Sequence, residues 1–266
     1  MDKTAADRSR RLITIPMSHY CEKARWGLER LGLPYFEERH LQLFHYPRTF
    51  LVSRGPNVPV LIDAGQVIAD STRILRHLDS YVDNADRLYP DDSALRVHVE
   101  AWEDRFDEEL GVDSRRWVYY HMLPYPAEAL ITAGQGAPAY ERKLAPYGYA
   151  FMKRFISNAL SVNPEDVAAG LTRSRATITE TDALLADGRP YLLGARFTAA
   201  DLALACMMSP YVLPRNYGIR LPTLDEVPAS MRADVCYFQA TRTGKYVLQL
   251  FDTERLRRIP ARPVSK

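Results

Sequence analysis

The chain has 266 residues, of which 47% are hydrophobic and 26% are charged, a balance typical of a globular protein. This length allows one large domain or two smaller domains, each with its own core. Its 35 basic and 33 acidic side chains leave a formal net charge of only +2. A charge this small creates no strong field toward polyanions, so we expect no nucleic acid and no membrane as a partner.

The sequence shows neither a targeting pattern nor a membrane span. Residues 1–11 are polar and charged and lack the apolar core of a secretory signal. No run approaches the roughly 18 apolar residues that would cross a bilayer. The three cysteines, Cys21, Cys206 and Cys236, make no disulfide framework in a chain of this size. We therefore expect a cytoplasmic protein whose thiols are reduced.

The first third of the chain alternates strand and helix patterns. A short apolar strand is predicted at residues 12–15, followed by a helix that ends at Gly32 and a second strand at residues 35–41. The apolar stripe of that helix consists of Cys21, Ala24, Leu28 and Leu31.

A hairpin and a helix complete this part. Residues 58–62 and 66–68 flank a tight turn at residues 63–65, where Gly65 supplies the positive φ. Ser71 is the expected N-cap of a helix at residues 72–78. The order is therefore β-α-β, an irregular stretch, and then β-β-α.

Helical periodicity dominates after the domain boundary that we place at residues 82–92. The first stripe consists of Leu95, Val99, Trp102, Phe106 and Leu110. Asn163 can cap a second long helix that has Pro164 in its first position and ends near Gly188. Residues 198–201 form a variant of the capping box before a buried helix at residues 202–208. The predicted class is α/β plus all-α, with domains at residues 10–83 and 92–260.

A stretch rich in Pro, Gly, Ala and Tyr lies between Leu123 and Pro146. We predict a structureless insertion here. An insertion of this length is commonly a lid or a binding loop, although a surface excursion without function is an equally good interpretation.

Ser18 lies at the turn between the first strand and the following helix. Unpaired backbone N–H groups and the positive end of the helix dipole stabilise an anion there. A free thiol is only a few per cent ionised at neutral pH, and a hydroxyl that donates a hydrogen bond to it favours the thiolate. Taken alone, Ser18 is more simply an N-cap.

Cys21 follows three residues later. A redox pair of the C-x-x-C kind is excluded because Ser18 holds the first position. Cys21 itself lies on the apolar stripe of its helix, which favours a small buried hydrophobe. Monothiol chemistry stays open but requires an exposure that the stripe argues against.

Two further segments can hold parts of a peptide. Pro59 starts a predicted strand, where it cannot donate a ladder hydrogen bond. A cis Val58-Pro59 bond would leave the backbone groups of Val58 free to pair with an extended peptide. Asp70 suits an ammonium group, and the hydroxyl and first amides at Ser71 suit a carboxylate, which together are the two charges of an amino acid's α-end. Each segment alone is equally consistent with a structural role.

In this order and spacing the motifs resemble those of the cytosolic glutathione transferase superfamily, over nearly the whole chain. The resemblance implies an N-terminal thioredoxin-like glutathione-binding domain and an all-helical C-terminal domain. It implies that Ser18 is the hydroxyl that activates glutathione, as in serine-type transferases. Val58 and Pro59 match the cis-proline loop that pairs with the cysteinyl backbone, and Asp70 and Ser71 match the pair that holds the γ-glutamyl end.

The resemblance also implies a homodimer, glutathione as co-substrate without a bound cofactor or metal, and a hydrophobic electrophile as second substrate in a detoxification reaction. Two features depart from the family pattern, namely the run at residues 54–57 before the proline and the stretch at residues 123–146. The residue that contacts the glycyl carboxylate stays open among His40, Gln42, His45 and Arg48. Aromatic residues that could line the electrophile pocket are Trp117, Tyr119 and Tyr120.

Three functions agree with this pattern. The first is a transferase in which Ser18 stabilises a glutathione thiolate. The second is a glutathione-dependent thiol-disulfide reductase that uses Cys21. The third is a glutathione-transferase-like binding protein without turnover, because a fold alone does not fix an activity.

Overall fold

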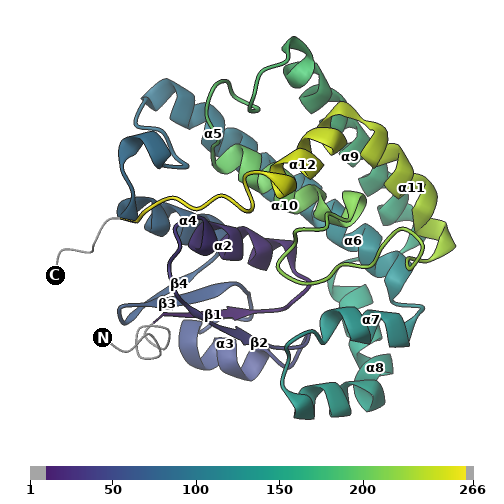
Figure 1. The fold of residues 1–266 in the computed structure, drawn as a ribbon. Helices are drawn as coiled ribbons and strands as arrows, with labels where there is room; N and C mark the ends of the chain where they lie inside the picture. The colour runs from purple at the N-terminus through teal and green to yellow at the C-terminus, as the bar shows by residue number, and fades with distance from the viewer. Residues whose placement is uncertain (1–9, 262–266) are drawn as a thin grey trace.

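A computed structural model describes residues 10–261 of the chain. The N-terminal part contains β1 (Arg11–Thr14), α2 (His19–Arg30), β2 (Phe36–Arg39), α3 (Tyr46–Ser53), β3 (Val60–Asp63), β4 (Gln66–Ala69) and α4 (Ser71–Leu78). The sheet order is β2-β1-β3-β4. Strand β1 runs parallel to β2 and antiparallel to β3, and β3 and β4 form the predicted hairpin. Helices α2 and α4 lie on one face of the sheet and α3 lies on the other (Figure 1).

Local sequence explains two features of this part. Ala64 and Gly65 both have positive φ, of 48° and 83°, as a two-residue hairpin turn of type I′ requires. Helix α4 begins at Ser71, one residue earlier than predicted, and its cap is Asp70 and not Ser71. The Oδ1 atom of Asp70 accepts a hydrogen bond of 3.0 Å from the backbone N–H of Arg73. The carboxylate is the stronger acceptor for an unpaired N–H of the first turn.

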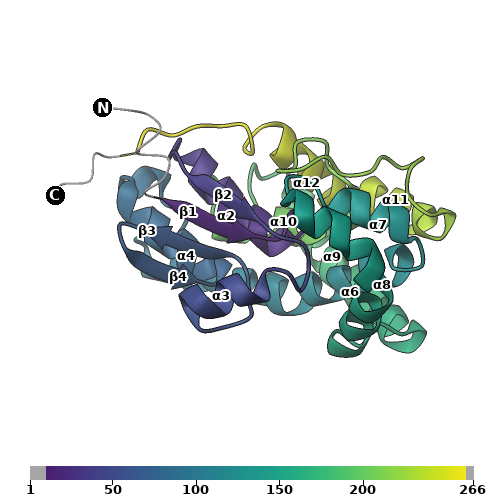
Figure 2. The same ribbon diagram turned by 90° about the horizontal axis from the view of Figure 1, so that it is seen from below.

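The second part is helical in all its long elements. These are α5 (Ser93–Arg105), a π-helical turn (Phe106–Leu110), α6 (Gly111–Met122), α7 (Pro126–Ala133), α8 (Ala139–Ala159), α9 (Pro164–Leu184), α10 (Ala199–Val212), α11 (Ala229–Ala240) and α12 (Arg242–Asp252). Short 3-10 turns occur at Asp79–Tyr81, Asn84–Asp86 and Leu185–Asp187. The helices lie to one side of the sheet (Figure 2). No helix of residues 10–261 is long and apolar enough to cross a membrane.

Helix α10 is the centre of this domain. Thirteen of its side chains are buried, and a helix that is apolar all round belongs in a core. Its N-terminus has the predicted capping box, in which Thr198 and Asp201 bond each other. The helix is longer than predicted, because Pro210 lies within it and does not end it. The cap of α9 by Asn163, with Pro164 in its first position, is also confirmed.

The prediction of a structureless insertion at residues 123–146 is wrong. These residues contain α7 and the first part of α8. Pro126 occupies the first turn of α7, where a missing N–H costs nothing. Pro146 lies on the exposed side of α8, and the helix continues because its opposite face is buried. That buried face consists of Glu141, Ala145, Tyr149, Met152 and Ile156.

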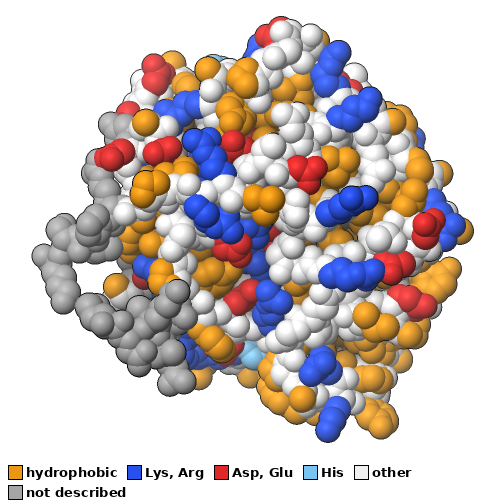
Figure 3. Space-filling view, in the orientation of Figure 1, with side chains coloured by type: hydrophobic (Ala, Val, Ile, Leu, Met, Phe, Trp, Pro, Cys, Tyr) orange, Lys and Arg blue, Asp and Glu red, His pale blue; other side chains and the backbone are white. Residues whose placement is uncertain are grey.

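A second row of large apolar side chains on α8 faces solvent. Figure 3 shows apolar side chains, with basic side chains among them, over this part of the molecule. The row consists of Tyr140, Leu144, Tyr147, Phe151 and Phe155.

Buried charges join the two parts of the chain. The Nζ atom of Lys23 on α2 lies 2.6 Å from Glu103 on α5 and 2.6 Å from Asp107 in the π-helical turn. Lys23 and Glu103 are fully buried. Burial alone would lower the pKa of Lys23, but Asp107 and Glu103 raise it to about 12. The pairing therefore fixes α2 against the helical domain in one register.

The C-terminal segment returns to the first domain. Arg255 pairs with Glu22 at 2.8 Å and with Glu29 at 2.7 Å, both on α2. The backbone N–H of Ile259 bonds the carbonyl of Arg30 at 2.6 Å. Residues near the end of the chain thus complete the surroundings of its first helix.

Candidate functional site

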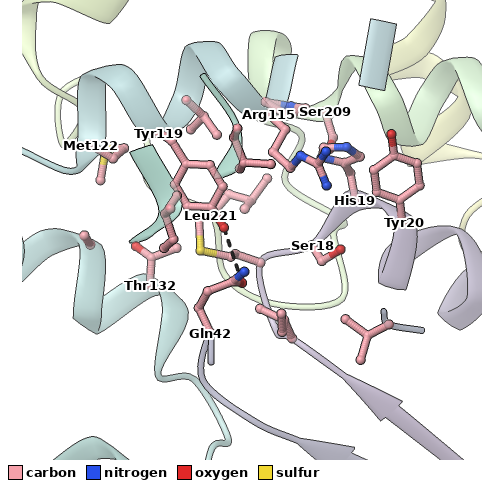
Figure 4. A pocket seen from close by; sticks show the side chains of 18 of the residues that line it. Ser18, His19, Tyr20, Gln42, Arg115, Tyr119, Met122, Thr132, Ser209 and Leu221 are labelled. Atoms are coloured by element: carbon pink, nitrogen blue, oxygen red, sulfur yellow. Dashed lines mark hydrogen bonds between the residues drawn. The ribbon is translucent and has the colours of Figure 1, made fainter. Parts of the chain in front are cut away.

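A pocket of about 230 Å³ lies between the two parts of the chain. Its sheet-side wall comes from the turn after β1, the start of α2 and the loop that precedes β3. Its helical wall comes from α6, α7, α8 and the C-terminal end of α10 (Figure 4). A cleft at a domain interface that is mostly apolar and contains a few polar groups is the usual form of a small-molecule site.

Ser18 lies on the wall of this pocket and caps α2. It has extended backbone angles, and its Oγ accepts a hydrogen bond of 3.3 Å from the N–H of Cys21. The side chain is partly exposed and faces the cavity (Figure 4). Because Oγ acts as an acceptor toward Cys21, its own proton remains available to a ligand. Both predicted roles of Ser18, cap and pocket residue, are therefore compatible.

Cys21 has no access to the pocket. Its side chain is fully buried, and it does not line the cavity. Burial raises the pKa of the Cys21 thiol to about 11, so the thiol is neutral and shielded. This geometry gives no support to the prediction of a reductase that uses Cys21, because thiolate chemistry needs ionisation and access.

The bond between Val58 and Pro59 is cis. Val58 lines the pocket, whereas Pro59 is buried behind it and its carbonyl accepts a hydrogen bond of 3.3 Å from Asp70. Among residues 10–261, no hydrogen bond engages the backbone of Val58. Its N–H and C=O are thus free for an extended ligand.

Asp70 and Ser71 lie apart from the main pocket. Asp70 is exposed, Ser71 is buried, and neither lines the cavity of Ser18. Asp70 has a φ of 88° and a ψ of 135°, a strained conformation that costs roughly 1–3 kcal/mol in a residue other than glycine. This conformation turns the chain from β4 into α4 and places the Asp70 carboxylate at the N-terminus of α4.

The structure separates the four candidates for a carboxylate contact. Arg48 forms two hydrogen bonds with Glu38, of 2.7 and 3.1 Å. His40 lies 2.6 Å from Glu141 and 3.3 Å from Glu38. Gln42 and His45 line the pocket instead.

Gln42 and His45 are therefore the candidates that face a ligand. The Oε1 of Gln42 accepts a hydrogen bond of 3.4 Å from Tyr119. Burial lowers the pKa of His45, so this imidazole is neutral near pH 7. Its Nε2 lies 3.0 Å from the carbonyl of Pro56, and its buried Nδ1 has no hydrogen-bond partner within residues 10–261.

Of the three aromatic candidates, only Tyr119 lines the pocket. Trp117 is buried in the helical core, where its indole N–H bonds Asp234 at 3.1 Å. Tyr120 points outward and is exposed. The stretch that contains α7 contributes Ala129 and Thr132 to the wall.

Three pocket residues were missed by the sequence analysis. His19 is buried, and burial together with Arg115 lowers its pKa to about 3. The Tyr20 hydroxyl donates a hydrogen bond of 2.6 Å to the carbonyl of Asp107. Arg115 extends from α6 toward these residues (Figure 4). No motif marks them, because α6 approaches α2 only in the folded chain.

Comparisons with known proteins agree with this geometry. Residues 12–85 match the family described as the glutathione S-transferase N-terminal domain, and residues 164–223 match its C-terminal domain. The chain therefore belongs to the cytosolic glutathione transferase superfamily. A comparison with curated protein sequences gives no significant match.

Many solved structures share the fold. A glutathione S-transferase of Ceriporiopsis subvermispora in complex with glutathione has 19% identity and a TM-score of 0.62, over 93% of this chain and 98% of that one. A theta-class transferase of Xanthomonas axonopodis pv. citri with glutathione bound has 21% identity and a TM-score of 0.54, over 90% and 97%. The β-etherase LigF of Sphingobium sp. strain SYK-6 has 17% identity and a TM-score of 0.58, over 91% and 99%. At these identities the likeness concerns the fold.

Proposed function

We propose that this protein is a glutathione transferase in which Ser18 activates the thiol of bound glutathione. The observation that carries the proposal is the hydroxyl of Ser18, which lines the pocket at the N-terminus of α2. In the reaction, the thiol proton goes to solvent and the thiolate attacks an electrophilic carbon. A carbon–sulfur bond forms, and the leaving group departs with its electron pair. Fold membership alone does not supply this conclusion.

One hydroxyl is enough for this activation. A hydrogen bond to a charged acceptor contributes roughly 1.5–3 kcal/mol, which lowers a thiol pKa by about one to two units. The N-terminus of α2 adds a favourable dipole. A bound thiol with an ordinary pKa of about 8.5 would then titrate near 7. Positioning and anion stabilisation thus supply the catalysis, without a covalent intermediate on the enzyme.

The peptide would extend along the sheet-side wall. The free backbone groups of Val58, beside Pro59, would pair with its cysteinyl unit. Asp70 and the first amides of α4 at Ser71 would hold the γ-glutamyl end, and Gln42 and His45 would contact the glycyl end. Glutathione is then a co-substrate and not a resident cofactor. We also propose a homodimer in solution, which light scattering after size-exclusion chromatography measures.

The electrophile would occupy the helical side. Its apolar wall contains Val118, Met122 and Leu221, which suits a hydrophobic second substrate. Helix α7 borders this half of the pocket through Ala129 and Thr132.

The test combines binding with turnover. Calorimetry should detect glutathione binding, and the protein should conjugate 1-chloro-2,4-dinitrobenzene. Ser18→Ala should lower kcat/KM by about ten- to hundredfold and raise the thiol pKa of bound glutathione by about one to two units. That pKa is measured from thiolate absorbance against pH. Ser18→Thr keeps a hydroxyl and an N-cap and should retain most of the activity.

Cys21→Ser is the matched control, because it replaces a buried sulfur atom by oxygen on the same helix. Its conjugation rate should stay within about threefold of the wild type, since Cys21 does not reach the pocket. An unchanged rate in Ser18→Ala would show that Ser18 is not the activating group. Loss of mixed-disulfide reduction in Cys21→Ser would identify a reductase. Absence of glutathione binding would identify a binding protein of this fold without transferase activity.

A further inference from the structure

Arg115 stands out among the residues that line the pocket. The helical wall is otherwise built from apolar and hydroxyl-bearing side chains, and among residues 10–261 no lysine, aspartate or glutamate lines the cavity. A guanidinium stays protonated in proteins. Arg115 therefore places a permanent positive charge in a pocket that is otherwise suited to a neutral hydrophobic molecule.

This charge has no acidic partner within residues 10–261. The Nε atom of Arg115 is buried without a hydrogen bond, and the guanidinium lies over the ring of Tyr20, 5.7 Å from its centroid. Its neighbour Arg116 contrasts with it, because Arg116 bonds Asp113 at 2.8 Å and the carbonyl of Leu160 at 2.9 Å. Arg115 is half-buried, and a charge that is partly removed from water is normally paired, so an unpaired one in a cleft indicates a ligand group.

Apart from Thr132, the other polar side chains of the helical wall are already engaged within residues 10–261. The hydroxyl of Tyr119 donates to Gln42, that of Ser209 to the carbonyl of Cys206, and that of Tyr217 to the carbonyl of Met17. The buried Nε2 of His19, beside Arg115, has no hydrogen-bond partner in the part of the chain that the structure describes. His19 is neutral near pH 7 because burial and Arg115 lower its pKa to about 3. It therefore does not compete with Arg115 for an anion.

Arg115 faces the reacting end of the pocket. Figure 4 shows its guanidinium above Ser18 and beside His19, whereas Gln42 lies at the opposite, sheet-side edge. A group bound at Arg115 would thus belong to the second substrate and lie near the attacking sulfur. The free backbone of Val58, which suits the peptide, is on the other wall.

We infer that Arg115 forms an anion-binding subsite that selects electrophiles carrying a carboxylate near the reacting carbon. This inference rests on the proposed function and narrows its substrate class from hydrophobic electrophiles to amphipathic acids. The guanidinium fork pairs with a carboxylate through two parallel hydrogen bonds. The apolar wall at Val118 and Met122 holds the remainder of the molecule.

The experiment compares 4-chloro-3-nitrobenzoate with 4-chloro-3-nitrobenzamide, which has the same shape without the charge. In both, the thiolate displaces chloride, and each kcat/KM is divided by the uncatalysed rate with glutathione. The wild type should prefer the acid by about ten- to hundredfold, as a charge-assisted contact predicts. Arg115→Gln should remove this preference and leave the amide rate within about threefold. Arg115→Lys should keep part of the preference for the acid, and Arg116→Gln should keep all of it.

The outcomes separate the two proposals. An equal loss with both substrates, together with a raised thiol pKa, would show that Arg115 acts on the glutathione thiolate and would overturn the inference. A wild type without preference for the acid would also overturn it. If neither substrate is conjugated, the proposed function fails, and the subsite is then tested by calorimetry with 3-nitrobenzoate. Binding that Arg115→Gln weakens about tenfold or more supports the subsite, and binding that it leaves unchanged refutes it.

Discussion

Removal of the Lys23 side chain tests the buried charges between the two domains. Lys23→Met keeps the length of the side chain but leaves the carboxylates of Glu103 and Asp107 without their cation. Both lie 2.6 Å from Nζ. Breaking a buried ion pair by removing one partner costs about 3–5 kcal/mol. Since one cation serves two carboxylates here, we expect the upper part of that range at pH 7.

The loss should depend on pH in a defined direction. Burial already raises the pKa of Asp107 in the folded protein, and Lys23 opposes that shift; without Lys23, burial and repulsion raise the folded-state pKa of one carboxylate further above its value of about 4 in the unfolded chain. The folded variant then binds a proton that the unfolded chain does not, so its stability rises as pH falls. One such proton contributes about 1.4 kcal/mol per pH unit. The difference from the wild type should therefore shrink by about 2–3 kcal/mol between pH 7 and pH 5.

Urea unfolding followed by tryptophan fluorescence measures both quantities, since Trp26 is buried on the same helix. Lys153→Met is the matched control, because Lys153 is exposed on α8 and its loss should cost less than about 0.5 kcal/mol. A cost below about 1 kcal/mol for Lys23→Met at pH 7 would refute the reasoning. So would a cost that is the same at both pH values.

Three further predictions concern the site and its surroundings. Maleimide should modify the exposed Cys236 in the native protein and should reach the buried Cys21 and Cys206 only after unfolding; mass spectrometry of native and denatured samples decides this, and early labelling of Cys21 would contradict its burial. Because the pKa of His19 is about 3 in the folded protein against 6.5 for an unperturbed histidine, the unfolded chain takes up the proton first as pH falls. The contribution of His19 to the free energy of unfolding should fall by about 2 kcal/mol between pH 6.5 and pH 5. In urea unfolding, His19→Gln should therefore lose less stability than the wild type over this pH range. Gln42→Ala and His45→Ala should each raise the KM for glutathione about fivefold, whereas Arg48→Ala, whose guanidinium is held by Glu38, should stay within about twofold; the opposite order in steady-state kinetics would place the carboxylate contact at Arg48.

Local sequence patterns predicted most of the fold, because turns and helix caps depend on residues that are adjacent in the sequence. The hairpin at residues 60–69 follows from the turn at Ala64 and Gly65, and the start of α9 follows from Asn163 and Pro164. The prediction misses α7 and α8, because the high content of Pro and Gly in residues 123–146 argues against helix. Pro126 stands in a first turn, where a proline is tolerated, whereas Pro146 stands inside α8, where burial of the opposite face of the helix offsets its cost.

The sequence predicted only those pocket residues that belong to local motifs. Ser18 and Val58 belong to motifs, and the structure places both on the pocket wall. Arg115 belongs to no motif, because its place on the pocket wall depends on where α6 lies relative to α2 in the folded chain. The choice of Gln42 and His45 over His40 and Arg48 likewise depends on Glu38 and Glu141, and Glu141 is distant in sequence.

The return of the C-terminal segment to α2 affects the order in which the protein can be completed during synthesis. Domains commonly fold as units from the N-terminus while translation continues. Here the partners of Glu22, Glu29 and Arg30 are Arg255, Glu254 and Ile259. During synthesis α2 therefore lacks these particular partners until residues 254–259 have left the ribosome. For most of its synthesis the nascent chain thus holds an N-terminal domain without these contacts, and a chaperone that binds near α2 has that whole interval in which to act.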